Sequence, residues 1–289
     1  MTGTLAPEAW RPRAEAHANR IDPYVMPHLD RRRRREPHPV HDFLFSYYSH
    51  RPAQLRRWHP GYGTRLLDAF ELAGSKGYAL VDGAAAVTRT HLESQVPLVE
   101  GIRALLAATA ARRPHLGCFG LHEWAMVYRA EESEVRHPWP LRLGPAGTDA
   151  VVESHRIRCS HFDAYRFFTP SARPLNTLSP TSTDRPAFEQ PGCLHASMDL
   201  YKHAFRLSPL IGSDLVADCF ELAWAVRTLD MRAAPYDLAG LGLEPVRIET
   251  QEGKQQYAAA QLDFAQRAAP LRERLIEECS RLLAEVAAA

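Results

Sequence analysis

The spacing of apolar and polar positions predicts helices along most of the chain. The clearest case is the segment of residues 97–113, where apolar side chains recur at helical spacing at Leu98, Ile102, Leu105 and Leu106. This spacing places them on one face of a helix. Pro114, which follows directly, is expected to end that helix.

Similar reasoning predicts one imperfect helix and an arginine-rich connector over residues 1–36. It also predicts helices over 40–48, 52–58, 64–75, 120–132, 193–207 and 213–232, and one long helix or a helix pair around Pro270 over 253–286. Ser213 starts one of them as an N-cap, with Asp214 in the first turn. Residues 138–168 instead combine turn residues with β-prone runs. We therefore expect a mainly α protein with an N-terminal helical and basic arm (1–36), followed by a single helical domain (37–289) that carries a small β insertion around 138–168.

Composition narrows the class of protein. The chain has 289 residues, of which 45% are hydrophobic and 24% charged, as in ordinary globular domains. The five cysteines are widely spaced and form no C-x-x-C pair, which argues against a disulfide framework or a zinc ribbon. No apolar run approaches the roughly 18 residues of a membrane span, and no apolar signal core is present near Met1. We therefore expect no membrane association and a cytoplasmic location.

The net charge of +1 means that any affinity for nucleic acid must come from local charge. Residues 31–63 supply it, in the sequence RRRRREPHPVHDFLFSYYSHRPAQLRRWHPGYG. Guanidinium groups suit phosphates, and aromatic rings stack on bases. DNA is the predicted partner, and its candidate contacts here are Arg31, Arg32, Arg33, Arg34, Arg35, Tyr47, Tyr48, Arg56, Arg57, Trp58 and Tyr62. The alternative is a solvated basic loop before an aromatic core helix.

A Pro-Gly-x-Gly turn lies at residues 60–63, and Asp82 follows further along the chain. Such a turn at the start of a helix presents backbone N–H groups to phosphate. The pattern is similar to the hairpin and aspartate of helix-hairpin-helix DNA glycosylases, in which the aspartate would sit beside the sugar of an extruded nucleotide. A plain loop is the alternative.

Histidines and carboxylates form a third set of candidates. His195, Asp199 and His203 are spaced i, i+4 and i+8, so they share one face of a helix. Helices of this kind build carboxylate–histidine metal sites, and the donors suit iron or zinc. The candidate ligands are His122, Glu123, His155, His161, His195, Asp199 and His203. The alternative is that these residues form polar outer faces and isolated core histidines.

The segment of residues 229–237 contains alternating charges. Asp230 and Arg232, together with Lys202 and Arg227, are predicted to form an ion-pair network that fixes the end of a helix. A structural role is favoured for this group.

Several strings together resemble a bacterial family commonly labelled 3-methyladenine DNA glycosylase, over about residues 38–275: HPVHDFLFSYYSHRPAQLRRWHPGYG, LHEWAMVYR, CSHFDAYRFFTP, QPGCLHASMDLYKHAFRLSP and DCFELAWAVRTLDMRAAPYDL. The resemblance implies a DNA-repair enzyme that flips out alkylated purines and hydrolyses their N-glycosidic bond without a cofactor. A carboxylate beside the sugar would come from Asp82, Asp199 or Asp218. The stacking residues would be Trp58, Tyr62 and Trp124.

Two other functions remain open at this stage. The first is a metal-dependent enzyme, such as a non-haem iron oxygenase, that acts on a small molecule through the histidine and carboxylate candidates. The second is a non-enzymatic protein that binds nucleic acid or nucleotides through the basic segment.

Overall fold

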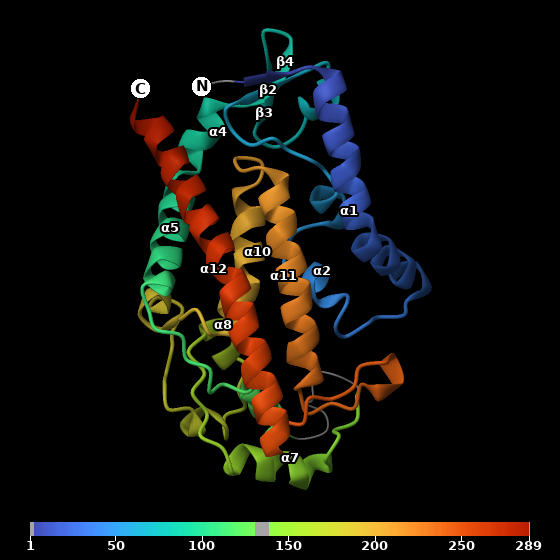
Figure 1. Cartoon of the computed structure of the whole chain (residues 1–289), viewed down its shortest axis with the longest axis vertical. Helices are drawn as coiled ribbons and strands as arrows, with labels where there is room; N and C mark the ends of the chain where they lie inside the picture. The colour runs from blue at the N-terminus through green and yellow to red at the C-terminus, as the bar shows by residue number, and fades with distance from the viewer. Residues whose placement is uncertain (1–2, 131–138, 289) are drawn as a thin grey trace. The chain divides into compact units, whose positions relative to one another are not determined.

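The computed structural model describes residues 3–130 and 139–288, and α-helices dominate this part of the chain. The described residues form twelve α-helices and one four-stranded sheet (Figure 1). The prediction of a mainly α protein with a small β element is therefore confirmed. Within the described ranges, no helix combines the length and the apolar character that a bilayer span requires.

Residue contacts divide the chain into two compact units. The first comprises Met1–Leu106, Leu200–Glu221 and Leu271–Ala289, and the second comprises Ala107–Asp199 and Leu222–Pro270. The predicted N-terminal arm, residues 1–36, thus belongs to the first unit together with the segments that follow it. Four helices contribute residues to both units, and these are α5 (Val96–Ala110), α10 (Leu194–Leu207), α11 (Ser213–Arg232) and α12 (Gln251–Ala287).

The first unit also holds a sheet and a set of mostly short helices. In chain order its elements are β1 (Gly3–Leu5), α1 (Pro7–Arg34), α2 (Phe43–Tyr47), α3 (Pro52–Leu55), β2 (Thr64–Leu67), η1 (Phe70–Leu72), β3 (Tyr78–Val81), β4 (Ala84–Val87), α4 (Arg89–Ser94) and most of α5 (Val96–Ala110).

Helix α1 follows from an apolar stripe at helical spacing. Its buried residues are Trp10, His17, Ile21, Val25 and His28, which lie on one face of a helix. The arginines at positions 31–34 form its last turn, where cations interact favourably with the helix dipole. The predicted arginine-rich connector is therefore part of the helix itself.

The β element lies elsewhere than predicted. The sheet has the order β1-β2-β4-β3, with β1 and β2 parallel and the other pairs antiparallel. The prediction of a helix over residues 64–75 was wrong, because this segment contains β2 and the 3-10 helix η1. Asp82 and Gly83 connect β3 to β4 with φ values of 49° and 79°. Such a two-residue turn with positive φ at both positions matches the twist of a hairpin.

The predicted β insertion around 138–168 was also wrong. Residues of this segment form α7 (Gly144–Glu153) and α8 (Phe162–Tyr165). In its described part, only isolated bridges occur, at Leu141 and Ile157; residue 138 lies outside the described ranges. The β propensity of this segment suggested strands. In the structure, Val151 and Val152 are instead buried on one side of α7, and burial of side chains outweighs β propensity.

The described residues of the second unit form helices and connecting loops. Besides its parts of the long helices and α7 and α8, it contains α6 (Leu121–Ala125), η3 (Arg173–Leu175), α9 (Arg185–Phe188) and η4 (Ala239–Leu241). The predicted helix over 120–132 is thus shorter than expected in its described part, and residues 131 and 132 lie outside the described ranges.

The Pro60–Gly63 turn packs against the loop that precedes α11. The backbone N–H of Tyr62 donates to the carbonyl of Leu210 at 2.9 Å, and the turn leads into a strand instead of opening a helix. The predicted phosphate site required a turn that opens a helix, and this part of the prediction was therefore wrong. A Cβ on Gly61, at φ 91°, would lie 3.1 Å from the nitrogen of Gly212.

Replacing Gly61 with alanine is expected to lower the free energy of unfolding by about 2–3 kcal/mol, because a left-handed backbone conformation and a backbone clash add together. Gly63→Ala is the matched control. Gly63 has a φ of 95° and an open environment, so only about 1 kcal/mol is expected there. Urea unfolding of both variants measures the difference, and equal losses would show that the clash is absent.

Two buried histidines of the first unit make stability depend on pH. Burial lowers the pKa values of His50 and His59 to about 4. Below the ordinary value of 6.5, the unfolded chain binds these protons first, so folding is disfavoured as pH falls. Between pH 6.5 and 4, each ring is expected to remove about 3 kcal/mol from the free energy of unfolding.

The measurement is urea unfolding at several pH values. His50→Leu should lower stability at pH 7 but reduce its slope between pH 6.5 and 4. Gln54→Leu, a nearby change that removes no titrating ring, should keep the wild-type slope. An unchanged slope in His50→Leu would contradict the assigned burial effect.

Candidate metal centre

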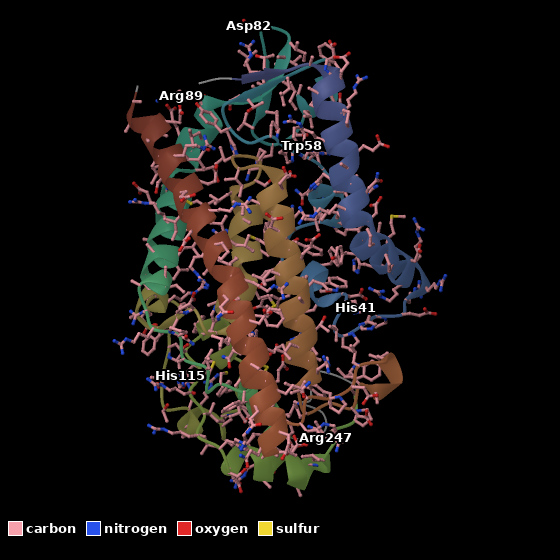
Figure 2. All side chains as sticks on the ribbon, viewed as in Figure 1. His41, Trp58, Asp82, Arg89, His115 and Arg247 are labelled. Carbon is pink, nitrogen blue, oxygen red and sulfur yellow. The ribbon has the colours of Figure 1, made fainter. Side chains whose placement is uncertain are left out.

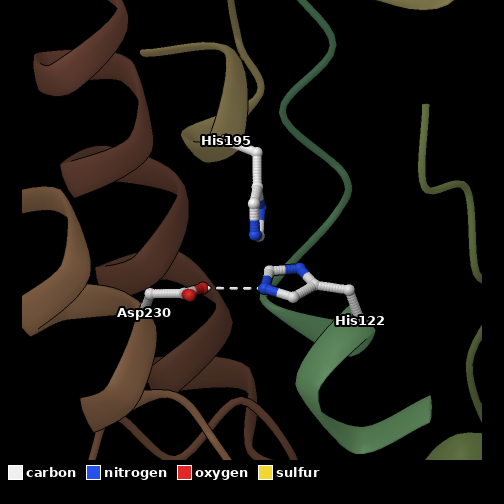
Figure 3. A group of neighbouring side chains, drawn as sticks. All are labelled: His122, His195 and Asp230. Atoms are coloured by element: carbon white, nitrogen blue, oxygen red, sulfur yellow. Dashed lines mark ion pairs between the residues drawn. The ribbon is translucent and has the colours of Figure 1, made fainter. Parts of the chain in front are cut away.

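Three side chains from separate helices converge in the second unit. They are His122 on α6, His195 on α10 and Asp230 on α11, and each offers one ligand atom within 4.8 Å of the others. Nε2 of His122 lies 2.9 Å from Oδ1 of Asp230. Figure 3 shows the ring of His195 directed toward the gap between these two groups. We call this group the His/His/Asp cluster.

Local structure fixes the position of α6 relative to the end of α11. Gly120 precedes α6 with a φ of 69°, and a Cβ there would lie 3.4 Å from both Ala233 and Tyr257. The indole N–H of Trp124 donates to the carbonyl of Ala233 at 2.8 Å. These contacts hold the short helix, and hence His122, against the residues that follow Asp230.

The His/His/Asp cluster is buried and incompletely satisfied. His122, His195 and Asp230 are 2%, 8% and 1% exposed. Despite their close approach, Nε2 of His122 and Oδ1 of Asp230 have no hydrogen bond of good geometry. Buried polar atoms are almost always hydrogen-bonded or bound to water or an ion. The two atoms pair with each other at 2.9 Å but have no further partner among the described residues, so they are the candidate ligand atoms.

Burial and neighbouring charges shift the pKa values of all three residues of the His/His/Asp cluster. Burial disfavours a charged imidazole at His122, but the carboxylate of Asp230 raises its pKa well above the ordinary value. Burial likewise opposes ionisation of Asp230, yet His122 holds the pKa of that carboxyl below its usual range. Burial and the nearby His122 lower the pKa of His195 well below 6.5. His195 is thus neutral and able to act as a ligand.

Arg227 anchors the carboxylates of this region. Its Nη1 donates to Oε1 of Glu123 at 2.8 Å and to Oδ2 of Asp230 at 3.1 Å. Oδ2 of Asp230 is therefore committed to the guanidinium, while Oδ1 faces His122. Groups that orient a ligand in this way tune metal sites.

A second cluster, formed by His161, Asp163 and Asp199, also brings ligand atoms within 4.8 Å of one another. His161 is fully buried, and its Nε2 lies 3.4 Å from oxygens of Glu189 and Asp199. Arg185 donates to Asp199 at 2.8 Å. This group has one histidine and two carboxylates, whereas the His/His/Asp cluster has the two-histidine, one-carboxylate set that binds non-haem iron.

The predicted metal ligands are partly brought together. His122 and His195 belong to the His/His/Asp cluster, whereas His161 and Asp199 belong to the second cluster. Glu123 is paired with Arg227 instead.

The other two predicted ligands belong to neither cluster. His155 follows the end of α7, with its Nδ1 2.6 Å from the carbonyl oxygen of Val151, and His203 is a buried residue of the first unit. Asp230 was expected only as part of an ion-pair network. The pair with Arg227 exists at 3.1 Å, but Asp230 also completes the His/His/Asp cluster.

The predicted catalytic carboxylates have different environments. Asp82 is in the β3–β4 turn with its side chain 82% exposed and 3.1 Å from Arg65 (Figure 2). Asp218 forms ion pairs with Arg20 and Arg274. Of the three, Asp199 alone is buried beside an imidazole.

Many predicted DNA contacts have partners inside the protein. Arg31 is paired with Asp42 and Arg56 with Asp22, whereas the side chains at positions 32–35 are exposed. The aromatic candidates are mostly structural: Tyr48, Trp58 and Trp124 are buried, Tyr47 stacks on Phe43 at 4.9 Å, and Tyr62 is half-buried.

Comparison with models of protein families gives no match. Searches of curated proteins and of solved structures give no match either. The resemblance to the glycosylase family therefore stays a prediction, and functional inference rests on the residues of the site.

Proposed function

We propose that this chain is a metal-dependent enzyme whose ion is bound by His122, His195 and Asp230. The observation that carries the proposal is a buried two-histidine, one-carboxylate set in which two facing atoms lack good hydrogen bonds. Such a set binds one face of an iron ion and leaves other positions for oxygen and substrate. Iron is accordingly the expected metal, with a small molecule as substrate.

The protein groups around the site have defined tasks in this proposal. Neutral His195 supplies an imidazole nitrogen, and Arg227 keeps Asp230 ionised and oriented through its Oδ2. Sγ of Cys118 lies 3.8 Å from Nδ1 of His122, which leaves Nε2 as the ligand nitrogen of that ring once the ion displaces its proton. Burial excludes bulk water and strengthens the electrostatic attraction between the ion and its ligands.

The test is anaerobic reconstitution with Fe(II), followed by measurement of iron content and of oxygen uptake in the presence of candidate substrates. The wild type is expected to retain about one equivalent, and Asp230→Asn less than about a tenth. Asp237→Asn is the matched control, because Asp237 is exposed in the same unit. Wild-type protein without stoichiometric iron, or Asp230→Asn with full iron, would overturn the proposal.

A second candidate function is excision of alkylated purines from DNA. Two observations favour it: the exposed arginines at positions 32–35 are accessible to phosphates, and Asp199 is a buried carboxylate. In this case metal-free wild type releases 3-methyladenine from alkylated DNA, and Asp199→Asn does not. Absence of base release by the wild type would remove this candidate without affecting the metal proposal.

A further inference from the structure

The first unit contains a pocket that neither proposed function uses. Its volume is about 390 Å³, and it is bounded by residues beside α3, at the start of α5 and at the end of α10. This size lies near the lower end of the range for small-molecule sites. A compact ligand fits such a space, whereas a duplex does not.

The charge of the pocket is positive. Arg57, Lys76 and Arg206 line it, and among the described residues no aspartate or glutamate does. None of the three cations has a carboxylate partner among the residues that the structure describes. By contrast, the hollow at the end of α1 contains Asp42, which neutralises Arg31. Three cations lining one hollow without a counter-charge attract a small anion.

Neutral polar groups complete the lining. Nδ1 of His50 lies 3.0 Å from the hydroxyl of Tyr201, and Nδ1 of His59 lies 3.1 Å from that of Tyr78. Since burial lowers the pKa of both rings to about 4, they add no charge near pH 7. The net charge of the lining is therefore that of its two arginines and its lysine.

Arg57 is already oriented, and the pocket lining also includes apolar side chains. Nη1 of Arg57 donates to Oγ of Ser75 at 2.8 Å, which reduces the side-chain freedom lost on binding. The ring of Phe205 stacks on His50 with centroids 4.8 Å apart, and Leu98 also lines the pocket. An anionic group and a carbon skeleton would thus each meet matching surface.

We propose that this pocket binds a small phosphate ester, with its phosphate held by Arg57, Lys76 and Arg206 and its carbon part against Phe205 and Leu98. Arginine matches phosphate oxygens with paired hydrogen bonds, and lysine adds a point charge. The inference does not depend on the metal centre, because it uses only residues of the first unit.

Calorimetric titration at low salt tests the proposal with three probes: inorganic phosphate, adenosine monophosphate and adenosine. We expect phosphate to bind, the monophosphate to bind more tightly, and adenosine to bind at least tenfold more weakly than its monophosphate. Arg57→Gln and Arg206→Gln should each weaken monophosphate binding by about tenfold or more, because each removes charge-assisted hydrogen bonds.

Arg13→Gln is the matched control, since Arg13 is an exposed arginine of α1 outside the pocket. Circular dichroism confirms that the variants fold. Undetectable binding of both phosphate and the monophosphate at millimolar concentration, or equal affinity in Arg13→Gln and Arg206→Gln, would overturn the proposal. Tighter binding of duplex DNA that the monophosphate cannot displace would overturn it too, because the cations would then act as an open surface.

Discussion

Co(II) added to the metal-free protein is expected to raise its free energy of unfolding by about 4 kcal/mol when free metal exceeds the dissociation constant a thousandfold. The three ligands come from α6, α10 and α11, which are far apart in sequence. The unfolded chain therefore has no preformed site, and the binding free energy adds to the stability of the fold. Urea unfolding followed by tryptophan fluorescence, with and without metal, measures the gain.

His195→Ala is expected to abolish this gain, because it removes the neutral imidazole ligand. His155→Ala serves as the control, since that ring contacts the carbonyl oxygen of Val151 and belongs to neither cluster. Retention of the full gain in His195→Ala would exclude the His/His/Asp cluster. If His161→Ala removed the gain instead, the ion would be assigned to the second cluster.

The sequence predicted the long helices well because their apolar periodicity extends over many turns. The observed α5, α10, α11 and α12 lie close to the predicted spans, although Pro270 is accommodated within α12. The sheet was missed because its strands are at most four residues long and β4 is largely alanine. The Asp82–Gly83 pair was the available signal, since Asp-Gly between short apolar runs is typical of a hairpin.

The residue types of the proposed metal site were predictable from the sequence, but their pairing was not. Histidines and carboxylates were the predicted ligands, and the structure brings two of them, His122 and His195, together. Asp230 was not predicted as a metal ligand, because Arg227, three residues earlier on the same helix, is already an ion-pair partner for its carboxylate. Which of several histidines meets a given carboxylate depends on contacts between distant segments, and a single sequence does not show these contacts.

A single sequence also does not show which arginines of the basic segment, residues 31–63, are neutralised by acidic side chains in the fold. Arg31 and Arg57 look equivalent in sequence, yet Asp42 neutralises the first, whereas the second lines a pocket without carboxylates. Local charge density in the sequence therefore does not distinguish an arginine that an acidic side chain neutralises from one that lines a pocket without described carboxylates.

Arg227→Met is expected to lower the free energy of unfolding of the metal-free protein by about 3–5 kcal/mol. Arg227 and Asp230 are 2% and 1% exposed, and Glu123 is 5% exposed. Removal of the guanidinium therefore leaves two buried carboxylates without their shared cation. Arg129→Met is the surface comparison: its partner Glu153 is exposed, so solvent screens the pair and a much smaller loss is expected.

The double variant Glu123→Gln/Arg227→Met separates charge from packing. It should be more stable than Arg227→Met by about 1–3 kcal/mol. The reason is that the buried charge of Glu123, which loses the guanidinium, is gone, whereas Asp230 still faces His122 at 2.9 Å. Added Co(II) should also restore part of the stability of Arg227→Met, since an ion at Asp230 replaces the lost positive charge. If Glu123→Gln gave no recovery and metal gave none either, loss of packing would account for the effect of Arg227→Met, and the electrostatic role assigned to this arginine would be wrong.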